Sequence, residues 1–304
     1  MLSVYYVGKR TLFDILRTGV FWGAFALAGF ICFSLLYWGW HQMKIEIERE
    51  HPKAGRTYVV EDGEMQGAEG DFNPFERFNP RHIILWWTYG IIIGFANLLS
   101  IFVMIGLISR EVERHTIDSI LARPVSRGQM LAGKMLAGWA ASIAFMALMV
   151  TWCLICMGVG GVGIQKGFVP ACVIGTLSPC VIGAVTLFLS IWMRGLLAGL
   201  IGTVLTFGSS TTGLLVIKAV GVELLKLKWA VWVVFKMLPP LNVIGEYATN
   251  HLQKDINFRM LDEVFESILP TPADGLYTEL WQVAAYLAVV VVLGYLSFFR
   301  RQFA

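Results

Sequence analysis

Charged residues are scarce in this sequence, and they leave long stretches that contain none at all. Only 15% of the 304 residues are Asp, Glu, Lys or Arg, whereas 57% are hydrophobic. A water-soluble chain of this length could not bury that much apolar surface, so the composition excludes a soluble domain. Because the apolar stretches have the length of membrane-spanning helices, the sequence predicts an all-α integral membrane protein.

Groups that usually carry catalysis or bind metals are equally sparse. The five cysteines lie in apolar segments, and Cys153-x-x-Cys156 matches a redox motif only in its letters, since no βαβ context surrounds it. The histidines are scattered and form no metal-binding pair, and no Ser/His/Asp set lies inside an apolar segment. We therefore expect no catalytic residue, no metal and no cofactor in this chain.

Six apolar stretches have roughly the 20-residue length that a bilayer core requires. They cover residues 20–40, 83–109, 135–157, 168–193, 195–220 and 280–299. Residues 1–19 have the amphipathic pattern of an interfacial helix, and we expect this helix followed by a six-span domain at 20–304. The open alternative for residues 1–19 is a basic flank that obeys the positive-inside rule. Pro179 should kink the fourth span, and Gly90 with Gly94 should permit the close approach of another helix.

Several polar side chains lie within the spans, where a group without a partner is costly. Asn97 and Ser100 fall near the middle of the second span, and Ser209 and Thr212 fall in the fifth. Two interpretations stay open: these groups line a translocation path, or they join helices and bond to carbonyls of their own helix. Five of the six spans contain no Asp, Glu or Lys, which counts against an ion-coupled transporter.

The distribution of charge predicts the orientation of the chain. With both termini in the cytoplasm, the inner segments hold 11 basic and four acidic residues, in agreement with the positive-inside rule. The loops at 41–82 and 221–279 then lie on the extracytoplasmic side, and the second of them is expected to contain short helices before the last span. We expect a multi-pass protein of the plasma (inner) membrane.

The most polar stretch between two spans is residues 110–134, which hold four Arg, one Lys, one His and three acids. Ile117, Ile120 and Leu121 form one apolar stripe of a short helix. Pro124 disfavours helix at the preceding residue, so this helix should end there. Ser126 can cap a second helix that continues into the third span.

Residues 111–134 resemble a segment of a known protein family. The pattern Glu111-x-Glu113-x-x-Thr116-x-x-x-Ile120-Leu121-x-x-Pro124-x-Ser126-Arg127-x-Gln129-x-x-x-Gly133-Lys134 is similar to the cytoplasmic loop of ABC-2 type permeases, the membrane subunits of ATP-binding-cassette transporters. The order of the spans extends this resemblance to the whole chain. One departure is His115, where the family pattern has Gly before the Thr.

The resemblance implies that a helix near residues 111–122 couples this chain to a separate ATPase. The alternative is an ordinary solvated loop whose charges only fix the topology. The complete transporter would contain two ATPase copies, which bind ATP and Mg²⁺. It would also contain a second permease copy, expected to be identical, and would lie in membrane lipid. No nucleic acid is involved. The residues expected on the coupling surface or in its support are Glu111, Glu113, Thr116, Ile120, Arg123, Pro124, Arg127 and Lys134. Export is the direction that the family implies, whereas the sequence identifies no substrate.

The segment from Gly128 to Lys134 matches the phosphate-binding motif G-x-x-x-x-G-K up to its last letter. Met135 stands where that chemistry needs Ser or Thr to hold Mg²⁺, and no strand precedes the motif. We therefore expect this chain to bind no nucleotide and to be no enzyme, with ATP hydrolysis in another polypeptide.

Two other classes of function remain open on the sequence. One is a membrane subunit of an ATPase-driven assembly or mechanotransmission complex that passes no solute. The other is a lipid-modifying enzyme. A continuous polar path between spans would favour transport, a closed interface with docking loops would favour the mechanical function, and clustered catalytic groups would favour the enzyme.

Overall fold

The computed structural model of the chain describes residues 2–50, 80–113, 126–160, 167–210, 238–241, 243–245, 248, 252 and 276–300. These residues form helices and, within the described ranges, no strand. The helices are α1 (Leu2–Arg17), α2 (Gly19–Glu50), α3 (Pro80–Glu113), α5 (Arg127–Gly160), α6 (Phe168–Gly175), α7 (Leu177–Trp192), α8 (Gly195–Gly208) and α13 (Leu276–Arg300). The all-α class expected from the sequence is thereby confirmed.

Five of the six predicted spans are helices long and apolar enough to cross a membrane. They are Gly19–Gly39, Ile84–Leu107, Gly128–Val159, Phe168–Trp192 and Trp281–Phe298. The span expected at 195–220 begins with α8, which has 14 residues and ends at Gly208. Residues 211–237 lie outside the described ranges, so the full length of this fifth span stays a prediction.

Helix α2 is longer than the span within it. It continues to Glu50, so the first ten residues of the loop expected at 41–82 are helical, and this part of the prediction is wrong. Residues 41–50 are rich in Gln, Lys, Glu and Arg, which favour helix.

Near Pro179, where a kink was expected, the helix is interrupted at Thr176, although the backbone angles of this residue stay helical (φ −61°, ψ −21°). Pro179 has no N–H to donate to the carbonyl four residues earlier, and its ring clashes with that carbonyl. The residue four positions earlier is Gly175, the last residue of α6. Thr176 separates the helices, and α7 resumes at Leu177.

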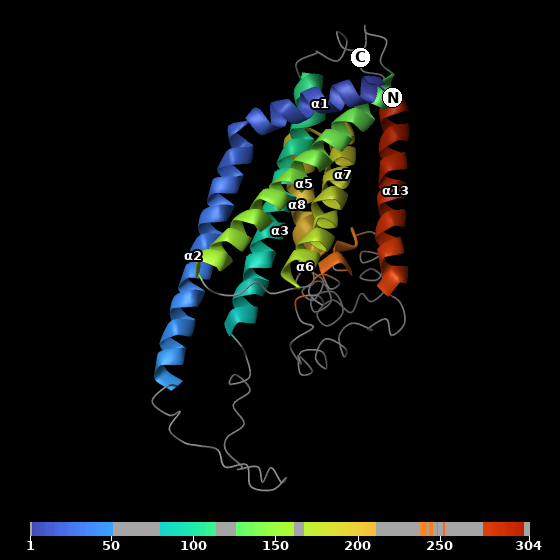
Figure 1. Ribbon diagram of the computed structural model, residues 1–304. Coiled ribbons are helices and arrows are strands. Elements are labelled where there is room, and N and C mark those ends of the chain that lie inside the picture. Colours follow the sequence, from blue (N-terminus) through green and yellow to red (C-terminus); the bar gives the residue numbers. More distant parts are fainter. Residues whose placement is uncertain are drawn as a thin grey trace.

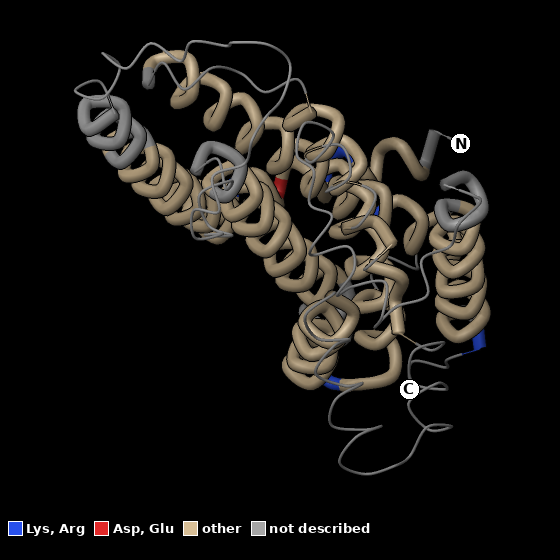
Figure 2. The backbone as a smooth tube through the Cα atoms, turned by 90° about the horizontal axis from the view of Figure 1, so that it is seen from below, with Lys and Arg blue, Asp and Glu red and all other residues tan. Residues whose placement is uncertain are grey.

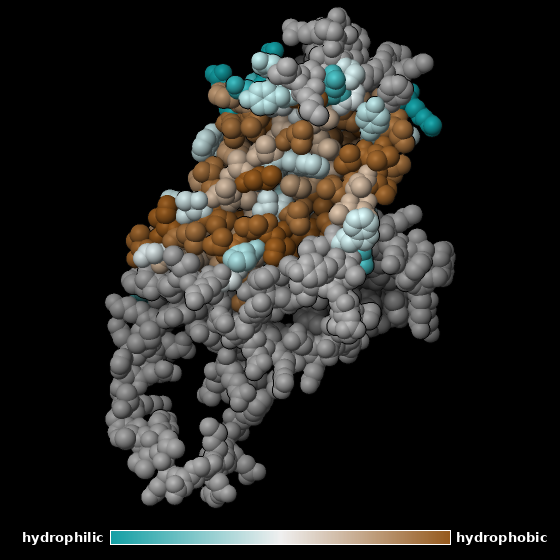
Figure 3. Space-filling view, turned by 45° about the vertical axis from the view of Figure 1, so that its right-hand side comes forward, coloured by the Kyte–Doolittle hydropathy of each residue, from teal (hydrophilic) through white to brown (hydrophobic). Residues whose placement is uncertain are grey.

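The spans form one bundle, and α1 lies across one of its ends (Figure 1). We call this end the α1 end. Ile15 of α1 is buried against the bundle, whereas Tyr6, Arg10 and Phe13 are exposed. In Figure 3 hydrophobic residues form a band over the visible face, and hydrophilic residues gather above it at the α1 end. The helix expected within residues 1–19 is therefore present, and its position in the membrane interface stays a prediction.

Helix α3 packs against α2, α5, α7 and α8. Small residues of α7 and α8 permit this: a side chain at Gly183 would meet Ser100, and one at Gly199 would meet Ile105. Gly90 and Gly94 behave differently, because no described atom lies within 4 Å of a Cβ placed on either. The close approach expected at these two glycines is therefore not made within the described part of this chain.

Figure 2 views the molecule from below, and charged residues are few among the described residues that it colours. Leu241 and Ile244 pack against Val181 of α7 and Val283 of α13. The predicted short helices at 221–279 fall mostly outside the described residues. Of the residues of this segment that are described, Leu241, Ile244, Ala248 and Leu252 are buried in the core.

Candidate functional site

The polar stretch at 110–134 is bounded by two described helix ends. Glu111 and Glu113 are in the last turn of α3, and Arg127 is the first residue of α5. The two acids thus continue the second span, instead of starting the separate helix expected near 111–122. The predicted coupling residues Thr116, Ile120, Arg123 and Pro124 lie outside the described residues.

Helix α5 begins with a reciprocal pair of capping hydrogen bonds. The backbone N–H of Gln129 donates to the hydroxyl of Ser126 at 3.3 Å, and the backbone N–H of Ser126 donates to Oε1 of Gln129, also at 3.3 Å. This capping box satisfies two backbone donors that a helix start leaves free. The capping box therefore marks the start of the helix that contains the third span. This start was predicted from Ser126.

Replacing Ser126 with Ala should loosen the first turn of α5. Loss of a capping hydroxyl costs about 1 kcal/mol, which corresponds to roughly fivefold faster hydrogen exchange at the Gln129 amide. Ser126→Asp retains an acceptor and adds negative charge at a helix N-terminus, so its exchange should stay close to that of the unchanged protein. Equal exchange rates in the Ala and Asp variants would contradict the capping role.

Lys134 lies about two turns into α5 and is only 4% exposed. Its Nζ donates to the backbone carbonyl of Leu107, in the last two turns of α3, at 2.7 Å. A charged donor to a carbonyl is among the stronger hydrogen bonds in proteins. Because it is buried in this chain, Lys134 can support the polar stretch by tying α5 to α3, but it does not present its charge on the surface.

Gly133, next to Lys134, lies against α1. A Cβ on Gly133 would be 3.0 Å from the carbonyl oxygen of Val4 and 3.0 Å from Cγ1 of Val7. The approach is mutual, since a Cβ on Gly8 would be 3.2 Å from the carbonyl oxygen of Gly133. The two helices therefore cross backbone to backbone, at a separation that any side chain larger than hydrogen would increase.

Gly128 begins the same stretch and faces α13, because a side chain there would collide with the ring of Tyr295. The three residues that resemble a phosphate loop thus contact three different helices: Gly128 meets α13, Gly133 meets α1 and Lys134 meets α3. All three lie in one continuous helix. We call residues 128–134 of α5, with these contacts, the α5 joint.

An apolar cluster lies directly beneath the α5 joint and connects the same helices. Its buried members include Ile15 of α1, Leu107 of α3, Leu131 of α5, Ile191 of α7 and Phe298 of α13. Protein interiors are close-packed, so a movement of one helix in such a cluster displaces its neighbours. The cluster therefore joins these five helices at the α1 end.

The polar residues predicted inside the second span face the break between α6 and α7. The Ser178 hydroxyl donates to Oδ1 of Asn97 at 3.1 Å, and the Ser100 hydroxyl donates to the carbonyl of Pro179 at 2.6 Å. All four residues are buried. Within this single chain, these groups join α3 to the broken helix and are not open to solvent.

The predicted polar residues of the fifth span are only partly described. The hydroxyl of Ser209 is buried and donates to the carbonyl of Leu205 on its own helix at 2.6 Å. Thr212 lies outside the described residues. Among the residues that the structure describes, no group of three or more His, Cys, Asp or Glu side chains could hold a metal ion.

Four contacts of the α5 joint were not foreseen: those of Gly8, Val4, Leu107 and Tyr295. A signal existed for the first, because Gly inside a helix is unfavourable and often marks a close backbone approach. For the others the sequence offers no signal, since a carbonyl acceptor can belong to any residue and Tyr295 lies 167 residues from Gly128.

Comparison with known proteins agrees with this architecture. A family model described as an ABC-2 family transporter protein matches residues 5–303. A search among curated proteins finds no significant match. The family match confirms the resemblance inferred from residues 111–134 and extends it over nearly the whole chain, which also contains five apolar helices long enough to span a membrane. This chain therefore belongs to the ABC-2 transporter family, as a multi-pass membrane permease of an ABC transporter.

Proposed function

We propose that this chain is the permease subunit that couples ATP hydrolysis by a separate ATPase to movement of a solute, by export, across the inner membrane. The observation that carries the proposal is the family match over residues 5–303. Membrane proteins of this family generally partner with an ATPase subunit. The supporting geometry is the α5 joint, which connects the ends of the polar stretch to α1, α3 and α13.

In the proposed mechanism, residues 110–134 lie in the cytoplasm and dock on the ATPase. Closure of two ATPase copies around ATP moves the docked segment, and Glu113 and Arg127 bound that segment on its two helices. The displacement passes along α5 to Lys134 and Gly133, and from there to α3 and α1. Coupling of this kind requires an element with two states that both sites bias, and the helix bundle would be that element.

The solute path is proposed to form between two identical copies of the chain. Support comes from the burial of Asn97, Ser100 and Ser178 between helices of one copy, which leaves no open polar path at these residues. The exposed apolar faces of the spans would then divide between lipid and the second copy. ATP and Mg²⁺ would be bound by the partner ATPase alone.

The test is capture of the ATPase by the intact chain from native membranes. The variant carries Glu113→Arg and Arg127→Glu together, which reverses the charge on both sides of the polar stretch and keeps the net charge. We expect at least tenfold less ATPase with this variant, because like charges placed across an interface oppose docking. A matched control carries Arg81→Glu and Glu279→Arg, at the helix ends away from α1, and should capture the ATPase normally.

Failure of the intact chain to capture any ATP-binding-cassette ATPase would overturn the proposal. Equal capture by all variants would keep the permease assignment but place docking elsewhere than beside Glu113 and Arg127. Reconstitution in vesicles then separates the two ATP-driven functions. ATP-dependent solute movement supports transport, whereas ATPase stimulation without any movement favours the mechanical assembly subunit.

A further inference from the structure

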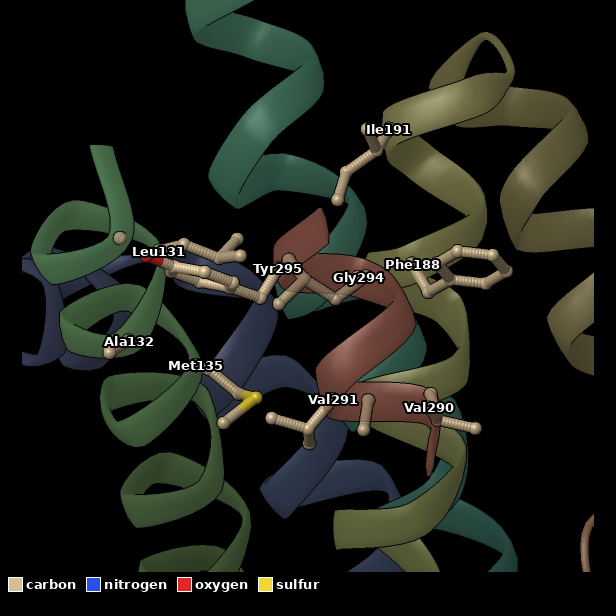
Figure 4. A pocket seen from close by; sticks show the side chains of 12 residues that line it. Leu131, Ala132, Met135, Phe188, Ile191, Val290, Val291, Gly294 and Tyr295 are labelled. Atoms are coloured by element: carbon tan, nitrogen blue, oxygen red, sulfur yellow. The ribbon is translucent and has the colours of Figure 1, made fainter. Parts of the chain in front are cut away.

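A pocket of about 60 Å³ lies between α5, α7 and α13, close to the α1 end (Figure 4). Its floor is formed by buried apolar side chains, among them Leu131, Leu187 and Ile191. Gly294 of α13 leaves it open, because a Cβ placed there would have nothing nearer than Phe188 at 3.9 Å. Among the described residues that line the pocket, Tyr295 alone has a side-chain oxygen or nitrogen atom.

The size and lining of this pocket exclude a solute-binding site. Sites for small molecules usually have volumes of roughly 300–1,000 Å³ and several convergent polar groups. This pocket is far smaller and belongs to helices within the apolar spans. An occupant must therefore be apolar and narrow, which describes a short part of one hydrocarbon chain. We call this pocket, lined by Met135, Phe188 and Val291 among others, the groove.

Positive charge is found at the α1 end of each of the three walls. Arg127 precedes the lining residue Gly128, Arg194 follows the lining residue Ile191 by three positions, and Arg300 follows Tyr295 by five. Arg194 and Arg300 are exposed. No Asp or Glu occurs in α5, α7 or α8, and the one acid of α13 is near its opposite end.

These two features together specify a ligand that is apolar along its length and anionic at one end. Arginine binds phosphate strongly through paired N–H groups. A tyrosine is suited to a position between the apolar pocket and the arginines, since its ring is apolar and its hydroxyl is compatible with the headgroup region. The groove is thus complementary to a lipid whose chain lies between the helices and whose phosphate lies at their ends.

We propose that the groove between α5, α7 and α13 binds an anionic phospholipid of the leaflet at the α1 end. One acyl chain lies beside Gly294, and the phosphate meets the arginines at positions 194 and 300. This inference goes beyond the proposed transport function and does not depend on it. The bound lipid would complete the packing of α13 against α5 and α7.

The experiment measures lipid retained by the purified full chain after reconstitution, comparing phosphatidylglycerol with phosphatidylcholine of the same chains. We expect the intact chain to prefer phosphatidylglycerol. Arg194→Gln with Arg300→Gln should weaken this preference about thirtyfold, since each basic residue near an anionic lipid contributes roughly fivefold. Gly294→Leu should fill the groove and remove retention, whereas Gly294→Ala, for which space exists, should keep it.

Matched controls separate the groove from general effects. Gly23→Leu adds the same side chain on α2, where no described atom lies within 4 Å, and Arg49→Gln with Arg81→Gln removes the same charge at the opposite end. Both should retain the lipid preference. Equal retention of the two lipids by the intact chain would overturn the proposal. The proposal would also be overturned if Gly294→Leu changed the oligomeric mass but left lipid retention unchanged. That result would mean that a second copy of the chain occupies the groove.

Discussion

Replacing Lys134 with Glu is expected to lower the free energy of unfolding by about 3–5 kcal/mol, the range for leaving a buried charge without compensation. Lys134 is 4% exposed, and its Nζ donates to the carbonyl of Leu107 at 2.7 Å. A carboxylate cannot donate to this carbonyl, and its negative charge would face the negative end of the C=O dipole. Thermal and denaturant unfolding in detergent measures the effect.

Lys134→Met is the comparison that isolates charge from shape. Methionine has a similar length and removes the charge, so both the desolvation cost and the hydrogen bond disappear together. Its effect on stability should be well below that of Lys134→Glu. If the Glu variant were as stable as the Met variant, the side chain would have reached water, and the tie between α5 and α3 would not be buried as described.

The Met variant also tests the proposed mechanism. If Lys134 transmits movement from α5 to α3, Lys134→Met should leave capture of the ATPase intact and reduce ATP-dependent transport. Unchanged transport in a stable Lys134→Met protein would assign Lys134 a structural role alone. Docking, stability and transport are all measured on the Lys134→Met protein. These measurements therefore distinguish a role of Lys134 in the stability of the fold from a role in transmitting movement from α5 to α3.

Replacing Gly133 with Leu is expected to separate α1 from α5. A Cβ there would lie 3.0 Å from the carbonyl oxygen of Val4, a backbone atom that cannot move away without moving the helix. Overpacking of this kind costs about 1–3 kcal/mol. Displacement of α1 exposes its buried side, so the amides of residues 4–8 should exchange hydrogen faster than in the unchanged protein.

Gly158→Leu provides the matched control for this change. Gly158 lies on the same helix, is exposed, and has no described atom within 4 Å of an added Cβ. The control should leave both stability and the exchange of residues 4–8 unchanged. Rapid exchange in both variants would mean that α5 as a whole is sensitive to Leu, and equally slow exchange in both would show that α1 is not held by the contact at Gly133.

The positions of the five described spans followed from the sequence, because a bilayer imposes its thickness on each helix independently of the others. A run such as 83–109 must be about 20 residues long and apolar wherever it packs. Local chemistry likewise located the start of α5 at Ser126, since its hydroxyl and Gln129 satisfy donors within one turn.

Helix boundaries beyond the membrane were predicted less well. Residues 41–50 and the pair Glu111 and Glu113 were assigned to loops or to a separate helix, but they continue α2 and α3. Outside the bilayer, hydropathy no longer marks the helix, and propensity alone decides where it ends. Glu and Lys favour helix while being polar, so a polar segment beside a span is a poor indicator of a loop.

What the sequence determined by itself is the class of the molecule: apolar runs of bilayer length, a basic stretch between two of them, and a motif that resembles ABC-2 permeases. The tertiary structure alone decided what the residues of that motif contact. Gly133 and Lys134 are adjacent in sequence, yet one meets α1 and the other α3, while Gly128 meets α13. Neighbours on a helix point in directions about 100° apart, so each partner depends on which helices the bundle places around α5.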